Sequence, residues 1–207
     1  MATALCRETV TPLLKELILQ SLEHERGGVL VYQTALECVV NDDLREEWTN
    51  YLQQTEQHVE ILAGVCDKLG LDAGEMTPGC KMVQHTGKSL VVAMKMALAE
   101  SDSAAAELVA CECAVLAETK DHANWGLIGQ CAKAFSGEVA DTLMAAYDEV
   151  EDQEDEHLYH TKGWCRELWL QALGLPAVLP PPEEQKDVKS EVSASRAKNA
   201  REELLKQ

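Results

Sequence analysis

The chain has 207 residues and a formal net charge of −18, with Lys+Arg 18 against Asp+Glu 36. This length suits one domain with a tail, and a hydrophobic fraction of 46% excludes a chain that is disordered throughout. So acidic a composition argues against nucleic acid as a partner, because phosphate binding needs an excess of lysine and arginine.

The sequence predicts a cytoplasmic protein that binds no membrane. No apolar run reaches the ~20 residues that a membrane helix needs, and the first residues lack the charged and apolar segments of a secretory signal. The eight cysteines are therefore expected to be thiols. Cys111 and Cys113 would point about 200° apart on a helix, so a cysteine-based zinc site is not expected.

The pattern predicts an all-α fold, because strand signals are nearly absent and proline and glycine lie at the edges of long uninterrupted stretches. Thr11 followed by Pro12 is typical of a helix start, and Gly70 of a helix end. The expected helices cover about 11–40, 43–69, 81–99, 103–134 and 137–173.

Residues 1–175 are expected to form one helical domain, and residues 176–207 a proline-rich linker with a charged, disordered tail that holds at most a marginal helix. Tight turns join the first helix to the second and the third long helix to the fourth. A long crossover with the short helix separates the two pairs. This order is the wiring of a ferritin-like four-helix bundle.

Acidic residues interrupt the apolar stripes of two of the long helices. Glu25 lies on the stripe of the first helix and Glu118 on that of the third long helix. Each glutamate is followed seven residues later by an aromatic side chain, Tyr32 or Trp125. A charged side chain on a core-facing stripe needs a partner, because burying an unpaired charge is costly.

The other two long helices carry histidines on their inner stripes. His58 follows Thr55 by three residues, and His157 follows Glu154 by three residues. This spacing brings both side chains to one helix face. One glutamate from each of two helices and a Glu-x-x-His from each of the others is the ligand set of a carboxylate-bridged di-metal centre. One histidine per metal with oxygen ligands suits iron or manganese.

These features resemble the ferritin-like superfamily, and most closely the bacterial stress-associated ferritin-like proteins of uncharacterised function. The resemblance covers residues 11–173. It is carried by residues 54–59 with Leu62, Leu69-Gly70, Cys80-Lys81-Met82 and residues 118–121 with Trp125. It implies a homodimer of four-helix bundles, each with two iron or manganese ions, and places Tyr32 next to the ligands. The implied metal residues are Glu25, His58, Glu118, Glu154 and His157.

One position departs from the pattern, since Thr55 stands where a complete site has glutamate. Either another side chain supplies the missing ligand, or the site is asymmetric, vestigial or empty. The candidates for the missing ligand are Glu56, Asp121, His122 and Glu151. The three other histidines, His24, His85 and His160, lie off the stripes or in the crossover and are expected at the surface.

Two functions from different classes fit the sequence. The first is a di-metal oxidoreductase or iron-binding stress protein that acts on O₂ or peroxide; iron storage in a large shell is a weaker variant. The second is a metal-free helical scaffold or interaction module whose acids and histidines form a buried polar network. In either case the C-terminal tail is a candidate site for a protein partner. Metal content distinguishes the two.

Overall fold

The computed structural model describes residues 8–207, which contain six helices and no strand. The predicted all-α class is confirmed for this part of the chain, while Cys6 lies outside it. Six of the others are free thiols: Cys38, Cys66, Cys80, Cys111, Cys113 and Cys165. The helices are α1 (Pro12–Cys38), α2 (Asp42–Lys68), α3 (Pro78–Glu100), α4 (Ser103–Ala134), α5 (Gly137–Ala172) and α6 (Glu191–Leu204).

Polar side chains define where α1, α2, α3 and α4 begin. Thr11, Asn41, Thr77 and Asp102 each accept a hydrogen bond from a backbone N–H of the first turn. The cap at Thr77, followed by Pro78 at the first helical position, starts α3 three residues before the predicted Lys81. Asn41 likewise starts α2 at Asp42, so the predicted break of the first helix serves as the cap of the second.

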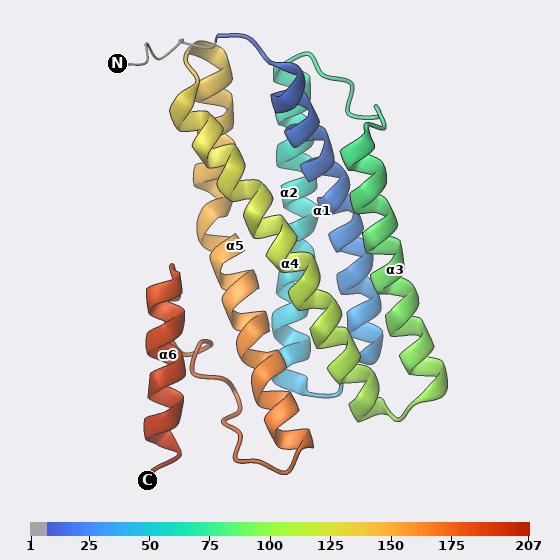
Figure 1. The fold of residues 1–207 in the computed structure, drawn as a ribbon, viewed down its shortest axis with the longest axis vertical. Helices are drawn as coiled ribbons and strands as arrows, with labels where there is room; N and C mark the ends of the chain where they lie inside the picture. Colours follow the sequence, from blue (N-terminus) through green and yellow to red (C-terminus); the bar gives the residue numbers. More distant parts are fainter. Residues whose placement is uncertain (1–7) are drawn as a thin grey trace.

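Four helices lie side by side, and each contacts two of the others: α1 with α2 and α4, and α5 with α2 and α4 (Figure 1). Neighbours in the chain run antiparallel. α3 packs along the outside against α1 and α4. Two hydrophobic clusters fill the interior, one around Trp48 and Trp164 and one around Ile18 and Ile128. A central set of buried acids and histidines lies between these two clusters: Glu25, His58, Glu118, Glu154 and His157.

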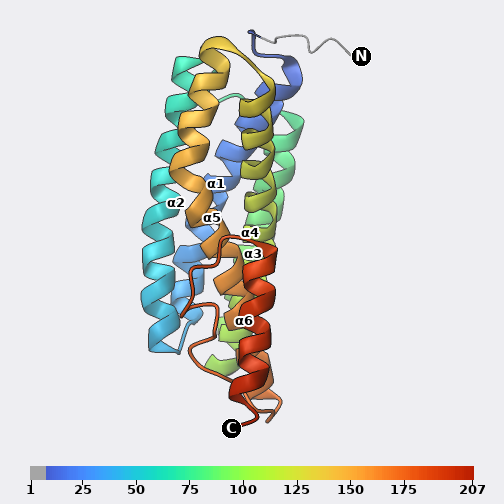
Figure 2. The ribbon, with the colours of Figure 1, turned by 90° about the vertical axis from the view of Figure 1, so that its left-hand side faces the viewer.

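The tail expected to be disordered contains α6, which lies beside the C-terminal half of α5 (Figures 1 and 2). Ser190 caps this helix, and Val188 packs with Leu158 and Tyr159 of α5 as a small third core. Ion pairs add to the contact: Arg201 of α6 pairs with the buried Glu167 of α5. A charged segment is ordered here because it covers an apolar strip of α5 and supplies partners for its charges.

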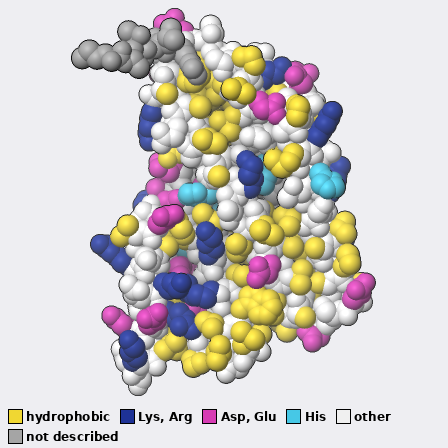
Figure 3. Space-filling model, viewed as in Figure 1, with side chains coloured by type: hydrophobic (Ala, Val, Ile, Leu, Met, Phe, Trp, Pro, Cys, Tyr) yellow, Lys and Arg dark blue, Asp and Glu magenta, His cyan; other side chains and the backbone are white. Residues whose placement is uncertain are grey.

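The outer face of α3 and α4 carries many hydrophobic side chains (Figure 3). At least a third of the surface of each is exposed, and they are Met82, Val92, Met96, Leu98, Leu116 and Leu127. No helix within residues 8–207 is long and apolar enough to cross a membrane.

Candidate metal centre

All five metal residues expected from the sequence lie together at mid-height in the helix bundle. α1 contributes Glu25, α2 His58, α4 Glu118, and α5 both Glu154 and His157. Each is at most 3% exposed. They are buried because they occupy the apolar stripes that face the centre, where the two hydrophobic clusters close off the site from both ends.

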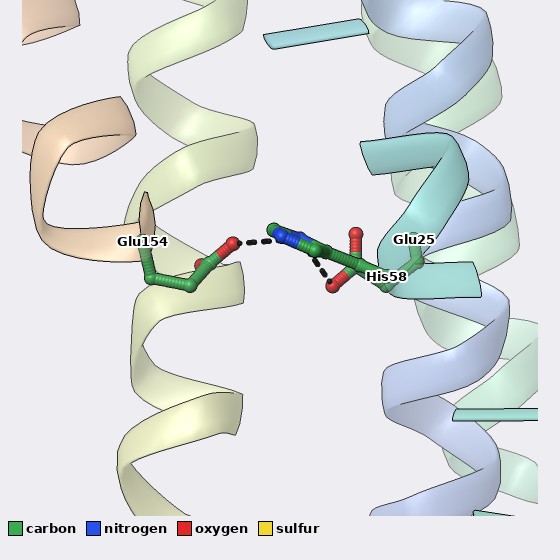
Figure 4. A group of neighbouring side chains, drawn as sticks. All are labelled: Glu25, His58 and Glu154. Carbon is green, nitrogen blue, oxygen red and sulfur yellow. Dashed lines mark ion pairs between the residues drawn. The ribbon is translucent and has the colours of Figure 1, made fainter. Parts of the chain in front are cut away.

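The first group of ligands surrounds the imidazole of His58. Its Nδ1 lies 3.4 Å from Oε1 of Glu25 and 3.2 Å from Oε1 of Glu154. Figure 4 shows His58 between the two carboxylates, which reach it from opposite sides. One ligand atom from each of the three residues lies within 4.8 Å of the others, a spacing that one metal ion can span.

A second group of ligands surrounds His157. Its Nδ1 lies 3.6 Å from Oε2 of Glu118 and 3.9 Å from Oε1 of Glu154. Glu154 therefore belongs to both groups, as a bridging carboxylate would. The rings of His58 and His157 are stacked with their centroids 5.7 Å apart. The arrangement thus offers two adjacent sites that share one glutamate.

Two glutamines orient the histidines. Nε2 of His58 bonds Oε1 of Gln153 at 2.9 Å, and Nε2 of His157 bonds Oε1 of Gln54 at 2.7 Å. An amide oxygen only accepts, so each histidine donates its Nε2 proton and presents Nδ1 to the carboxylates. Such a bond on the far nitrogen is how metal-binding histidines are usually held. Both glutamines come four residues before their own helix's histidine, a repeated Gln-x-x-x-His that the sequence analysis overlooked.

The two aromatic residues each donate a hydrogen bond to the glutamate of the opposite helix. The hydroxyl of Tyr32 on α1 donates to Glu118 on α4 at 2.7 Å. The indole of Trp125 on α4 donates to Glu25 on α1 at 2.7 Å. The seven-residue spacing of glutamate and aromatic in each helix is therefore a crossed pair of hydrogen bonds. On Glu118 the bond leaves Oε2 to face His157, whereas on Glu25 the same Oε1 accepts from Trp125 and faces His58.

Among the four candidates for the missing ligand, Asp121 is the one buried beside the cluster, at 5% exposure. Burial and the charges of Glu25, Glu154 and Glu118 hold the pKa of Asp121 well above its usual range. Glu56 and Glu151 are exposed. His122 bonds Asp155 at 2.7 Å.

Thr55 does not face the cluster with its oxygen. The hydroxyl donates to the backbone carbonyl of Tyr51 at 2.8 Å, and the methyl group lies against Gly28. Position 55 on α2 therefore supplies no acid to the cluster, and the additional buried acid beside it is Asp121 from α4.

The cluster carries more negative charge than its protein partners can balance. Five carboxylate oxygens have no hydrogen-bond partner: Glu25 Oε2, Glu118 Oε2, Asp121 Oδ1 and both oxygens of Glu154. Within residues 8–207, no lysine or arginine forms an ion pair with any of these acids. Burial and the charges of Glu25 and Glu118 raise the pKa of Glu154 to about 7, despite its ion-pair contact with His58.

The imidazole of His58 responds to the same excess of charge. Burial alone would lower its pKa, but the bonds and charges of Glu154 and Glu25 outweigh burial and raise the pKa to about 11. Four carboxylates and two neutral imidazoles would balance the charge of two divalent cations. The donor set of oxygens with one nitrogen per site also fits iron or manganese.

A surface hollow of about 360 Å³ approaches the centre between α4 and α5. Glu154 and Trp125 form its inner wall, while His122 and Asp155 lie along its side. The start of α6 and the residues before it, 189–191, complete the rim. A small molecule could reach Glu154 by this route.

Two expectations about the remaining histidines are wrong. His24 and His160 are each 8% exposed rather than at the surface. His24 donates to the carbonyl of Ala117 at 3.0 Å, which places it in the contact between α1 and α4. His85 is exposed, as expected.

Comparisons of the chain with protein-family models, with curated proteins and with solved structures found no match. The side chains of the cluster, their burial and their charges are therefore what bears on its function.

Proposed function

We propose that this chain is a ferritin-like four-helix bundle that holds two iron or manganese ions and acts in oxidoreductase chemistry on O₂ or peroxide. Glu25, His58 and Glu154 would hold one ion, and Glu118, His157 and Glu154 the other. Asp121 adds the fourth carboxylate. Support comes from the convergence of four helices on one spot and from the pairing of two helix pairs across a crossover.

The observation that carries this proposal is the set of five buried carboxylate oxygens with no hydrogen-bond partner. They belong to Asp121 and to three glutamates that lie against His58 or His157, namely Glu25, Glu118 and Glu154. A folded protein seldom leaves buried carboxylates in this state, because desolvation costs several kcal/mol for each uncompensated ion. Divalent cations remove that cost. A purely structural polar network would be expected to include lysine or arginine.

Iron or manganese ions, when bound, supply electrons for the reduction of O₂ or peroxide. The residues around them have separate tasks. Gln54 and Gln153 keep Nδ1 of each histidine directed inward, and Tyr32 and Trp125 hold Glu118 and Glu25 in place. The hollow beside Glu154 admits a molecule of the size of O₂ or peroxide, while the hydrophobic clusters keep bulk water from both ends.

Metal analysis of protein purified without chelators tests the proposal. We expect about two ions per chain and their loss in the Glu154→Ala, His157→Ala double variant. The matched control is Glu60→Ala, His85→Ala, which removes the same two residue types from exposed positions and should retain the metal. Absence of metal from the wild type, with a thermal stability that EDTA and added Fe²⁺ or Mn²⁺ leave unchanged, would contradict it.

The ion pairs inside the cluster favour a second candidate, a metal-free scaffold in which protonated histidines neutralise the acids. Glu118 illustrates it: burial opposes ionisation, but the bond and charge of His157 lower the pKa of Glu118 overall. This candidate predicts that the chain works only as a binding module. The homodimer is a further proposal, which light scattering of the purified protein would test, and a protein partner at the C-terminal tail is another.

A further inference from the structure

A second group of possible ligands lies about one helix turn from the centre, at the seam between the bundle and the C-terminal segment. It consists of Glu47 on α2, His160 on α5 and Glu184 in the segment before α6. Nδ1 of His160 lies 3.7 Å from Oε1 of Glu47 and 3.5 Å from Oε1 of Glu184. One ligand atom of each lies within 4.8 Å of the others.

The histidine of the group is buried, its two glutamates are partly exposed, and its charges are not balanced. The side chains of Glu47 and His160 are each 10% exposed, and Oε1 of Glu47, Oε1 of Glu184 and Nε2 of His160 have no hydrogen-bond partner. In the described part of the chain, no lysine or arginine forms an ion pair with either glutamate. Two carboxylates thus face one imidazole with nothing else to neutralise them.

The preceding residue, Glu183, is a glutamate of the same segment whose charge is balanced by an arginine. Arg166 of α5 holds both oxygens of Glu183, at 2.6 and 2.8 Å. Glu184 has no such partner. Burial, together with the bond and charge of Glu47, raises the pKa of Glu184 to about 10. Burial and the nearby Glu47 therefore oppose the ionised form of Glu184 when no cation is present.

The surroundings favour a cation. The group opens into a surface hollow of about 630 Å³ whose rim includes Asp43, Glu46 and Glu156, so the hollow attracts positive ions and leaves room for water ligands. The indole of Trp164 donates to Oε2 of Glu47 at 2.8 Å, which directs Oε1 toward His160. The hydroxyl of Tyr51 lies 3.0 Å from Nδ1 of His160, and a cation at that nitrogen would displace this bond.

We propose that Glu47, His160 and Glu184 bind one divalent transition-metal ion, of the class of Zn²⁺ or Co²⁺, which fastens the C-terminal segment to the bundle. Two carboxylates and one imidazole, with water completing the shell, form a common ligand set for these ions. The site shares no residue with the central cluster, so it stands or falls independently of the proposed function. Its role is structural, since Glu184 is its one ligand outside α2 and α5.

Co²⁺ titration of metal-free protein tests the site, because the visible absorption of Co²⁺ reports its ligands. We expect Glu184→Gln to bind one Co²⁺ fewer per chain than the wild type. Glu46→Gln is the matched control: it removes the same charge from the rim of the same hollow and should bind as many ions as the wild type. Equal numbers of ions in Glu184→Gln and the wild type would overturn the proposal.

Proteolysis provides a second measurement that does not depend on counting ions. Trypsin can cut after Lys186 and Lys189, which are exposed and follow Glu184 directly. Zn²⁺ at about 100 times its Kd should lower the cleavage rate by up to about 100-fold, because it lowers the population of the detached segment by that factor. Glu184→Gln should lose this protection, and the central Glu154→Ala, His157→Ala variant should keep it. Cleavage of the wild type that Zn²⁺ does not slow would overturn the proposal.

Discussion

The α1–α2 pair and the α4–α5 pair place the same residues at equivalent positions but differ at the centre. Each pair contributes a glutamate, an aromatic seven residues later, and a histidine with a glutamine four residues before it. At the two remaining positions, Gly28 and Thr55 in the first pair correspond to Asp121 and Glu154 in the second. The first pair is therefore neutral where the second carries two acids.

This difference gives the two halves of the site different roles, one in closing the centre and one in charge and access. On the α1–α2 side, a Cβ at Gly28 would lie 3.2 Å from the methyl group of Thr55, so the two helices close tightly. On the α4–α5 side, the acids are buried at the end of the hollow that leads to the surface. We infer that one half seals the centre while the other supplies the additional charge and the route of access.

The largest expected effect comes from comparing substitutions at two equivalent positions, Thr55 on α2 and Glu154 on α5. Glu154→Gln should weaken metal binding by more than the about 100-fold that loss of an outer partner causes, because Glu154 belongs to both ligand groups. Thr55→Ala should retain both ions. Metal content by mass spectrometry measures both variants, and similar losses in the two would show that the halves contribute equally.

Removal of the ions should affect the acid-rich half most. A ligand at about 100 times its Kd stabilises a protein by about 2.7 kcal/mol, which for a chain of this size is roughly 5–10 °C in Tm for each ion. EDTA should therefore lower the Tm. Hydrogen exchange should increase more around Asp121 and Glu154 than around Gly28 and Thr55. Uniform exchange would contradict the assignment of charge to one half.

Alanine substitutions at two glycines, one in each half, test how tightly the helices are packed there. A Cβ at Gly129 of α4 would lie 2.6 Å from the ring of Tyr147 on α5, whereas a Cβ at Gly64 of α2 meets nothing within 4 Å. Gly129→Ala should therefore destabilise by about 1–3 kcal/mol. Gly64→Ala should stabilise by up to about 1 kcal/mol through helix propensity. Urea unfolding measures both, and equal effects would mean that α4 and α5 can separate at little cost.

The crossed hydrogen bonds should matter equally to both halves. Tyr32→Phe and Trp125→Phe each remove one donor from a buried carboxylate, and each should cost about 1–3 kcal/mol in the metal-free protein. Their effects should be smaller with metal bound, because the ion then compensates the carboxylate. Chemical denaturation with and without Mn²⁺ measures the difference. A cost confined to one variant would show that the two bonds are not equivalent.

The smallest expected effect is a pH dependence found in one half. His122 stands where the first pair has Val29, and its bond to Asp155 raises its pKa above the usual 6.5 despite partial burial. The stabilisation is therefore complete below pH ~6.5 and is lost as the pH rises through the higher pKa of the folded state. An NMR titration should find a raised pKa for His122 that Asp155→Asn lowers; no change would rule the pair out.

The helices were largely predictable because their signals are local. The threonine–proline start at Thr11 and the glycine end at Gly70 need no knowledge of the rest of the chain. The same start at Thr77 and Pro78 was passed over in favour of Lys81, although it obeys the same rule. The tail was harder to predict, because Val188 and Ala197 are ordered by contacts with distant residues rather than by their own sequence.

The convergence of the five central residues could be predicted because a 3.6-residue period shows which side chains face inward. The partners of those residues could not. Periodicity does not reveal that Trp125 bonds Glu25 rather than Glu118, since this depends on how the helices are paired in space. His160 was misjudged for the same reason, because Glu184, from a segment outside the bundle, buries it.

The crossed bonds of Tyr32 and Trp125 have a consequence for biogenesis. Glu25 and Glu118 each accept a hydrogen bond from an aromatic side chain of the other helix pair. His58 and His157 each donate a hydrogen bond to a glutamine of the other pair. During synthesis on the ribosome, α1 and α2 emerge first but cannot assemble a finished binding pocket. The ions proposed above would therefore enter only after α5 has docked, and their binding would report that the four helices have assembled.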